Sequence, residues 1–158
     1  MSEVIAPVSV RQVPVDLVRP LRHRVLRSGF PEASVHTDRD DDPATVHLAA
    51  FAGDDVIGVV TMFPDPYPED SGRTAQRFRW MAIDEARRGS GAGTALLRQA
   101  ATISRDGGFE LMWAHGRDTA QGFYERLGFR VSPNGYVDKI TNVSHHYVVI
   151  ESATLAGR

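Results

Sequence analysis

The chain has 158 residues and no cysteine; 42% of its residues are apolar, 24% are charged, and its formal net charge is −2. This length and composition predict a single domain over residues 1–158 with a packed core. The small net charge argues against a nucleic-acid partner, and the lack of cysteine excludes disulfides, thiolate catalysis and cysteine-bound zinc. No apolar run is long enough to span a membrane, and the first ten residues lack a signal-peptide pattern, so we expect a cytoplasmic protein without a membrane partner.

The apolar periodicity predicts elements in the chain order β-α-β-β-β-α-β-α-β-β, which indicates an α/β fold: a mixed sheet with helices on its faces. The strands are expected over residues 8–13, 45–52, 56–63, 76–84, 109–115, 129–133 and 144–152. The helices are expected over residues 14–27, 91–105 and 117–128. Pro20 lies inside the first helical run, so that helix is expected to kink there or to begin near it.

The stretch Ala86–Ala100 places three glycines within five residues, directly before an amphipathic helix. The first N–H groups of a helix lack partners within the helix, and the helix dipole makes this end positive. Glycines let a ligand approach the backbone closely, and Arg87 and Arg88 add positive charge. These features favour a phosphate as the ligand, and above all a diphosphate.

The residues of this glycine loop leave several interpretations open. A P-loop would need G-x-x-x-x-G-K-[ST], but the stretch has no lysine. A dinucleotide-binding loop would need G-x-G-x-x-G after the first strand, whereas this chain has G-x-G-x-G after the fourth. A diphosphate-bearing cofactor bound by another fold, a plain nucleotide, and a glycine-rich connection without a ligand are the remaining candidates.

Two motifs taken together resemble the GNAT family of N-acetyltransferases. The family pattern Q/R-x-x-G-x-G/A is met by Arg88, Gly91 and Gly93, after an apolar strand end. The second motif is met by Ala120, Phe123, Tyr124, Gly128 and Phe129. Both motifs occur in the order and spacing of the family, over residues 79–130. The resemblance implies the single-domain acyl-CoA N-acyltransferase fold of that family, in which the central strands splay apart.

The resemblance implies acetyl-CoA as the acetyl donor, used as a co-substrate and without a metal. Its pyrophosphate would bind the backbone N–H groups of the glycine loop, and its pantetheine arm would lie along the preceding strand end like an added strand. The implied cofactor-binding residues are Met81, Ala82, Ile83, Arg88, Gly89, Ser90, Gly91, Ala92, Gly93, Thr94 and Arg117. Arg117 stands where many family members have asparagine, which leaves open how the cofactor or the tyrosine is oriented.

The resemblance also implies direct transfer of the acetyl group to an amine, without a covalent enzyme intermediate. This reaction needs a neutral amine, a polarised carbonyl and a proton for the leaving thiolate. Tyr124 matches the family tyrosine that donates this proton; the alternative is that its ring only packs in the core. A backbone N–H of Ala82 or Ile83 would polarise the thioester carbonyl.

The general base is not fixed by either motif. His115, at the end of a predicted strand, and His145, at the start of the last one, are candidates, because histidine takes up a proton near neutral pH. Each histidine taken singly is more commonly structural, and Asp84 or Glu85 could serve instead. We expect no metal at His145 and His146, because adjacent residues on a strand point to opposite faces.

The acceptor is expected to be a small-molecule or peptide amine. The acidic run His36–Asp42 could attract a cationic amine, although such runs are commonly solvated loops. A homodimer is one option for the assembly. The second class of function is a non-catalytic acyl-CoA-binding module on the same fold, which would keep the glycine loop but has no need of Tyr124. The presence of this tyrosine favours catalysis.

Overall fold

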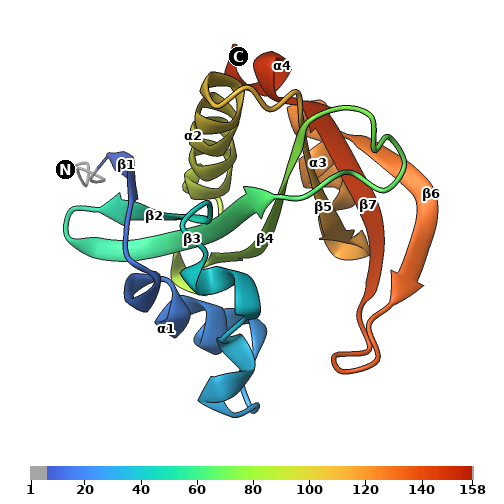
Figure 1. Cartoon of the computed structure of the whole chain (residues 1–158). Helices are drawn as coiled ribbons and strands as arrows, with labels where there is room; N and C mark the ends of the chain where they lie inside the picture. The colour runs from blue at the N-terminus through green and yellow to red at the C-terminus, as the bar shows by residue number, and fades with distance from the viewer. Residues whose placement is uncertain (1–6, 158) are drawn as a thin grey trace. The chain divides into compact units, whose positions relative to one another are not determined.

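A computed structural model describes residues 7–157 of the chain. Within these residues there are seven β-strands and four α-helices, joined by several 3₁₀ turns (Figure 1). The strands are β1 (Val8–Gln12), β2 (Val46–Ala52), β3 (Asp55–Pro64), β4 (Ala75–Ile83), β5 (Leu111–Arg117), β6 (Arg130–Val137) and β7 (Ser144–Glu151). The helices are α1 (Arg19–Leu21), α2 (Ala92–Asp106), α3 (Gln121–Leu127) and α4 (Ser152–Ala156). The predicted order is confirmed, and α4 is an addition to it.

The strands form one mixed sheet in the order β1-β2-β3-β4-β5-β7-β6. The pairing of β4 with β5 is parallel, whereas β1–β2, β2–β3, β5–β7 and β6–β7 are antiparallel. The β4–β5 pairing runs only from Ala75↔Leu111 to Arg77↔Trp113, although both strands continue beyond it. Such a short pairing is what a splay of the central strands requires.

The described residues fall into two compact units, and each is described by itself below. The first unit contains the described residues up to Phe63 together with Trp80–Ala100. The second unit contains Pro64–Arg79 and the described residues from Ala101 onward. The single domain expected over residues 1–158 stays a prediction.

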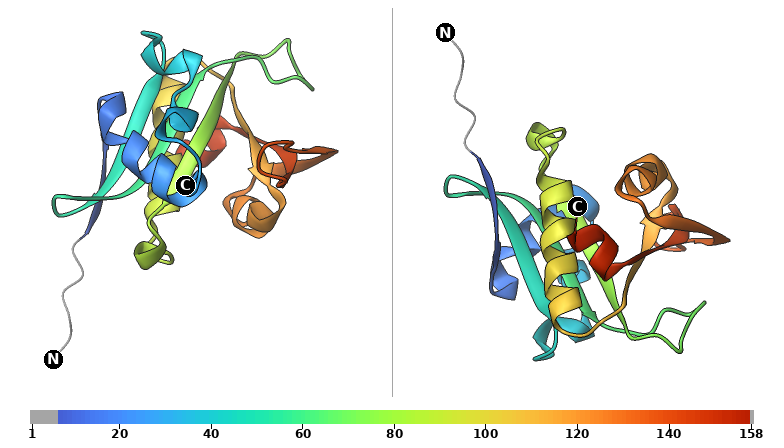
Figure 2. Two further views of the ribbon diagram at one scale, coloured as in Figure 1. Left: turned by 90° about the horizontal axis from the view of Figure 1, so that it is seen from below. Right: turned by 90° about the horizontal axis from the view of Figure 1, so that it is seen from above.

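In the first unit, helical segments cover both faces of the strands. One face carries a core cluster made of Val18, Leu21, Ala49, Phe51, Val59 and Ala82. On the opposite face, a Cβ added to Gly58 would lie 3.1 Å from the Leu96 side chain of α2, so this glycine lets the helix approach the sheet. Figure 2 shows α2 and the α1 region on opposite sides of β2 and β3.

The predicted first helix is broken into short pieces. Val15–Leu17 is a 3₁₀ turn, α1 has only three residues, and Arg22–Leu26 is a π-helical turn. Pro20 occupies the first turn of α1, where its missing N–H costs no hydrogen bond. The helix therefore begins near Pro20, which is one of the two outcomes that the sequence allows.

In the second unit, the two faces of the sheet carry different side chains. A buried cluster of Tyr67, Ala75, Leu111, Trp113 and Val149 lies on one face. On the other face the ring of Tyr124, from α3, packs against Phe78 and Phe129, with ring centroids 6.1 and 5.3 Å away. β6 and β7 form a long hairpin, and β6 extends further than the predicted strand 129–133 (Figure 1).

Among residues 7–157, no helix is long and apolar enough to cross a membrane. The expected absence of a signal peptide concerns in part residues 1–6, which lie outside the described residues. The cytoplasmic location and the homodimer stay predictions.

Candidate functional site

The glycine loop belongs to the first unit and leads from β4 into α2. After the strand ends at Ile83, the side chain of Asp84 accepts a hydrogen bond from the N–H of Ala86 at 3.1 Å and starts a 3₁₀ turn. Residues 88–91 are exposed. Gly89 and Gly91 have φ angles of +81° and +86°, in the left-handed region that favours glycine. Glycine is therefore needed at both positions for the path of the chain.

The loop ends at the N-terminus of α2, and its backbone suits an anion. The N–H of Ala95 donates to the carbonyl of Gly91 at 3.0 Å, so Ala92, Gly93 and Thr94 stand in the turn whose N–H groups have no intrahelical acceptor. A Cβ added at Gly91 would meet no atom within 4 Å, which leaves room for a ligand. Left-handed residues next to a helix start form a concave set of N–H donors. A pyrophosphate fits this arrangement.

The strand end before the loop combines burial with an unusual backbone conformation. Ala82 is buried, while Met81 and Ile83 are half-buried. Trp80 has a φ of +57°, which is uncommon for a bulky residue. Its buried ring is held by the guanidinium of Arg22 at 5.2 Å from its centroid. Met81–Ile83 lie beyond the three-residue pairing with β5, so the added-strand role of this segment stays a prediction.

Tyr124 lies on α3 in the second unit and is buried. A Cβ added to Gly116 of β5 would lie 3.0 Å from the Tyr124 ring and 3.0 Å from Val148, so glycine at this position makes room for the tyrosine. The helix ends at Gly128, which has a φ of +101°, as the sequence predicts. The local sequence thus fixes the ring of Tyr124 against β5.

Two influences act on the pKa of Tyr124. Burial raises it to about 12, because the charged phenolate is poorly solvated, and the positive charge of Arg117 acts in the opposite direction. The hydroxyl is therefore protonated at neutral pH and able to donate. If Tyr124 donates its proton, a phenolate remains, and the positive charge of Arg117 favours this charged form.

His115 and His145 lie on the face of the second-unit sheet opposite to Tyr124. In the β5–β7 pairing, His115 stands opposite Tyr147 and Arg117 opposite His145. His145 Nδ1 donates to the carbonyl of Val143 at 2.9 Å, so Nε2 is the ring nitrogen that takes no part in this hydrogen bond. The ring of Tyr124 thus packs on one side of β5, at Gly116, whereas the side chain of His115 lies on the other side of the strand.

Burial, together with the smaller effects of the positive charges of Arg77, His145 and Arg79, lowers the pKa of His115 to about 4. The ring is therefore neutral at pH 7. Because the folded-state pKa lies below the ordinary 6.5, the unfolded chain binds this proton more readily, and stability must fall as pH drops from about 6.5 to about 4.

We expect the wild-type chain to lose more stability between pH 7 and pH 5 than a His115→Gln variant, which cannot be protonated at this position. The urea midpoints of both proteins at the two pH values measure this difference. An equal loss in both proteins would show that His115 has an ordinary pKa in the folded state.

The sequence motifs do not indicate a contact between His146 and Asp118. His146 Nδ1 lies 2.6 Å from Asp118 Oδ1, and Gln121 donates to the same oxygen at 3.3 Å. His145 instead stacks on Tyr136 at 5.2 Å between ring centroids, so the two adjacent histidines do point to opposite faces. Asp118 is the first residue of the 3₁₀ turn Asp118–Ala120, and the N-cap of this turn is Arg117. None of the described residues form a group of three or more His, Cys, Asp or Glu that could hold a metal ion.

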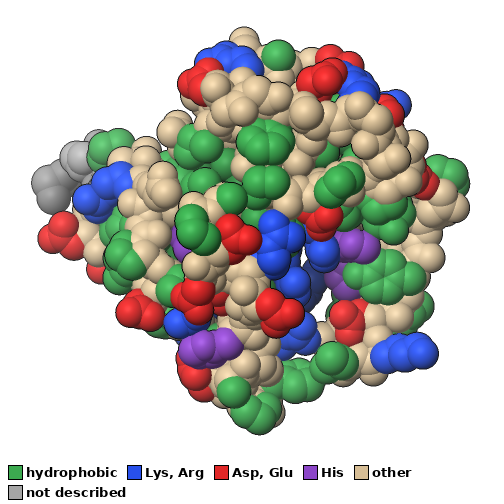
Figure 3. Space-filling view, in the orientation of Figure 1, with side chains coloured by type: hydrophobic (Ala, Val, Ile, Leu, Met, Phe, Trp, Pro, Cys, Tyr) green, Lys and Arg blue, Asp and Glu red, His purple; other side chains and the backbone are tan. Residues whose placement is uncertain are grey.

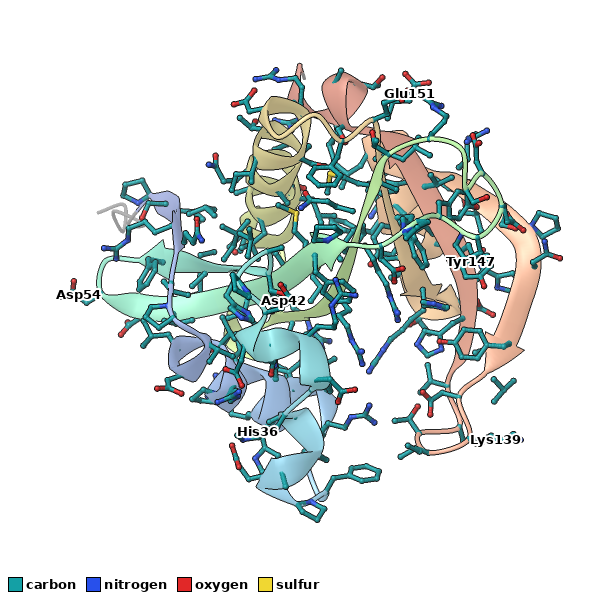
Figure 4. The ribbon with its side chains drawn as sticks, in the orientation of Figure 1. His36, Asp42, Asp54, Lys139, Tyr147 and Glu151 are labelled. Carbon is teal, nitrogen blue, oxygen red and sulfur yellow. The ribbon has the colours of Figure 1, made fainter. Side chains whose placement is uncertain are left out.

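The acidic run His36–Asp42 is partly neutralised within the first unit. Asp40 is buried and forms a two-pronged ion pair with the fully buried Arg22, at 2.9 and 3.1 Å. Although burial alone would raise the pKa of Asp40, the hydrogen bond and charge of Arg22 lower it to about 2. A nearby pocket mixes acidic and basic groups, since it is lined by Asp16, Arg19, Pro20, His23, Glu32 and His36. This segment is therefore expected to attract cations less strongly than its sequence suggests. His36 and Asp42 are labelled in Figure 4.

The chain is similar to known acetyltransferases. The model of the acetyltransferase (GNAT) family matches residues 15–129, which include both the glycine loop and Tyr124. The uncharacterized N-acetyltransferase YitI of Bacillus subtilis is 24% identical over 143 residues, which cover 90% of this chain and 95% of that protein.

Solved structures share the fold along almost the whole chain. A GNAT-family protein from Desulfovibrio desulfuricans has a TM-score of 0.67 and 25% identity, covering 92% of this chain and 99% of its own. An aminoglycoside 6′-N-acetyltransferase complexed with coenzyme A has a TM-score of 0.73, covering 91% of this chain and 97% of its own. Its identity is only 12%, so it supports the fold alone.

Proposed function

Because the chain belongs to the GNAT acetyltransferase family, we propose that it transfers an acetyl group from acetyl-CoA to the amine of a small molecule or peptide. The observation that carries this proposal is the geometry of the glycine loop. Gly89 and Gly91 adopt left-handed conformations, next to open space and directly before α2, as a pyrophosphate site requires.

In the proposed complex, the pyrophosphate accepts hydrogen bonds from the backbone N–H groups of residues 89–94. Arg88 is exposed and adds charge from its side chain. The pantetheine arm follows the backbone of Met81–Ile83, where an N–H of Ala82 or Ile83 polarises the thioester carbonyl.

The proposed reaction is a direct aminolysis. The amine nitrogen forms a bond to the carbonyl carbon of the thioester, the bond from that carbon to sulfur breaks, and the products are an amide and CoA. Tyr124 donates a proton to the departing thiolate, and Arg117 stabilises the phenolate until it is reprotonated. The amine loses its proton to a base, for which His115 is one candidate: its ring is neutral at pH 7, but its pKa of about 4 makes it a weak base. His145 is the alternative base, and a shift in the acidic limb of the pH–rate profile in His115→Ala or in His145→Ala identifies the one that acts.

Replacing Gly91 by valine is expected to weaken CoA and acetyl-CoA binding by roughly 10–100-fold. The branched side chain fills the space beside the N–H donors, and each hydrogen bond lost to a charged group costs about 1.5–3 kcal/mol. Isothermal titration calorimetry measures the affinity, and thermal shifts with acetyl-CoA, CoA and ATP measure the selectivity.

Gly53→Val is the matched control, because Gly53 also has a positive φ, +62°, and open space around its Cβ position, but lies in the β2–β3 turn. This variant carries a similar backbone strain and should keep CoA affinity. An unchanged CoA affinity in a folded Gly91→Val variant would contradict the pyrophosphate assignment. Tighter binding of ATP than of CoA would indicate a plain nucleotide binder instead.

A further inference from the structure

One face of the second-unit sheet combines basic and aromatic side chains that the motifs do not explain. We call it the basic–aromatic face and define it by Arg77, Arg79, His115, Tyr136, His145 and Tyr147. The pairing places them together: Arg77 stands level with Trp113 in β5, two residues before His115, and His145 stands opposite Tyr136. In Figure 3, histidine and hydrophobic side chains gather over β6 and β7.

The aromatic rings of this face form a continuous wall. The ring of His115 lies 5.0 Å from Tyr147 and 5.1 Å from Tyr136, and Tyr136 stacks on His145 at an interplanar angle of 12°. Tyr147, labelled in Figure 4, lies 5.8 Å from the buried Trp113. Tyr136 is 43% exposed, so the wall has an accessible end that a planar apolar group can cover.

The charge beside this wall is positive. Arg77 and Arg79 of β4 act on His115, whose pKa they lower, and Arg77 also lies 5.4 Å from the Trp113 ring. Among the neighbouring acidic groups, Asp65 Oδ2 lies 3.9 Å from Arg77 Nη1, which is longer than a hydrogen bond. Asp138 accepts hydrogen bonds from the N–H groups of Ile140 and Thr141 in the β6–β7 turn, and its charge acts on Tyr136 against the charges of Arg77 and Arg79. Guanidinium groups bind carboxylates through paired hydrogen bonds, so this surface suits an anion attached to a flat apolar body.

We propose that the basic–aromatic face binds the acceptor, and that the acceptor is an amine carrying a carboxylate on an aromatic body. This inference rests on the proposed function and names its substrate class. The carboxylate binds Arg77 and Arg79, the ring packs on Tyr136 and Tyr147, and the amine is presented toward His115. A polycationic acceptor is disfavoured, because these arginines repel it.

The test compares pairs of amines that differ only in the carboxylate: phenylalanine with phenethylamine, and tryptophan with tryptamine. Spermidine serves as the polycation. With acetyl-CoA and the full chain, we expect kcat/KM to be about 10–100-fold higher for the carboxylated member, the ratio that one charge-assisted contact of about 1.5–3 kcal/mol provides. Release of CoA measures the rate.

Variants separate charge from packing. Arg77→Gln should bring the ratio within each pair close to one, and Arg77→Lys should restore part of it. Tyr136→Ala should raise KM for both members of a pair and leave their ratio unchanged. Arg105→Gln is the matched control, since Arg105 pairs with Asp106 on α2 and should leave the ratio as it is.

The outcomes distinguish this inference from the proposed function. If acetyl-CoA does not bind, the proposed function fails. If acetyl-CoA binds but phenethylamine or spermidine reacts as well as phenylalanine or better, the function stands and the inference is wrong. If no amine reacts, binding of N-acetylphenylalanine to the CoA-loaded chain is measured instead, and this measurement tests the inference. Binding that depends on Arg77 supports the inference, and its absence overturns it.

Discussion

Replacing Tyr124 by phenylalanine is expected to lower kcat by roughly 10²–10⁴-fold, the usual contribution of a positioned general acid, while acetyl-CoA affinity barely changes. Phenylalanine keeps the ring that packs on Phe78, Phe129 and Gly116 and removes only the hydroxyl. Since the pKa of this hydroxyl is raised to about 12, it carries its proton throughout the neutral range, and no other group is expected to replace it at the thiolate. Steady-state kinetics together with acetyl-CoA titration measure the two effects.

Tyr67→Phe is the matched control for this variant. It also removes a buried tyrosine hydroxyl in the second unit, one that donates to Glu69 at 2.7 Å, but this tyrosine has no assigned role in the reaction. It should retain turnover. If the folded Tyr124→Phe variant also retained near-full turnover, the proton would come from water or another group, and Tyr124 would be only a core aromatic residue.

Replacing Arg22 by alanine is expected to destabilise the chain by about 3–5 kcal/mol, the cost of leaving one member of a buried ion pair alone. Arg22 is fully buried and donates to Asp40, to the carbonyl of Val35 at 3.0 Å and to the hydroxyl of Thr61 at 2.6 Å. Its loss leaves the Asp40 carboxylate without its main partner. It also removes one of the two guanidinium groups that lie 5.2 Å from the ring of Trp80, the other being that of Arg27. Urea denaturation at pH 7 measures the change.

Controls for the ion pair come from the same region. Arg24→Ala removes an exposed partner of Asp84 and should cost no more than about 1 kcal/mol. An Arg22→Met, Asp40→Leu double variant should be less destabilised than Arg22→Ala, since it leaves no buried charge unpaired. Because the pKa of Asp40 is lowered to about 2, the stabilisation is complete above about pH 4 and is lost as pH falls toward 2. An Arg22→Ala variant as stable as wild type would contradict this role.

The glycine loop and the order of the elements could be predicted because their signals are local. Gly89 and Gly91 need positive φ angles, and the helix that follows shows its own periodicity, so neighbouring residues are enough to locate the loop. The end of α3 at Gly128 was predictable for the same reason. The family motifs extended this information to the fold of most of the chain.

Other features depend on residues far apart in the sequence and could not be predicted from it. Arg22 is separated from Asp40 by 18 positions and from Thr61 by 39, and no local pattern indicates that its guanidinium is buried. The partnership of His146 with Asp118 likewise arises only when β7 pairs with β5. The basic–aromatic face exists because four strands, β4 to β7, bring alternate residues to the same side.

Acetyl transfer to an amine is tested by incubating the purified chain with acetyl-CoA and the amine panel and quantifying both products by mass spectrometry. We expect equal amounts of N-acetylated amine and free CoA, with both greatly reduced in Tyr124→Phe. Acetyl-CoA that binds the chain but stays intact with every amine would contradict this expectation, and would indicate a non-catalytic acyl-CoA-binding module.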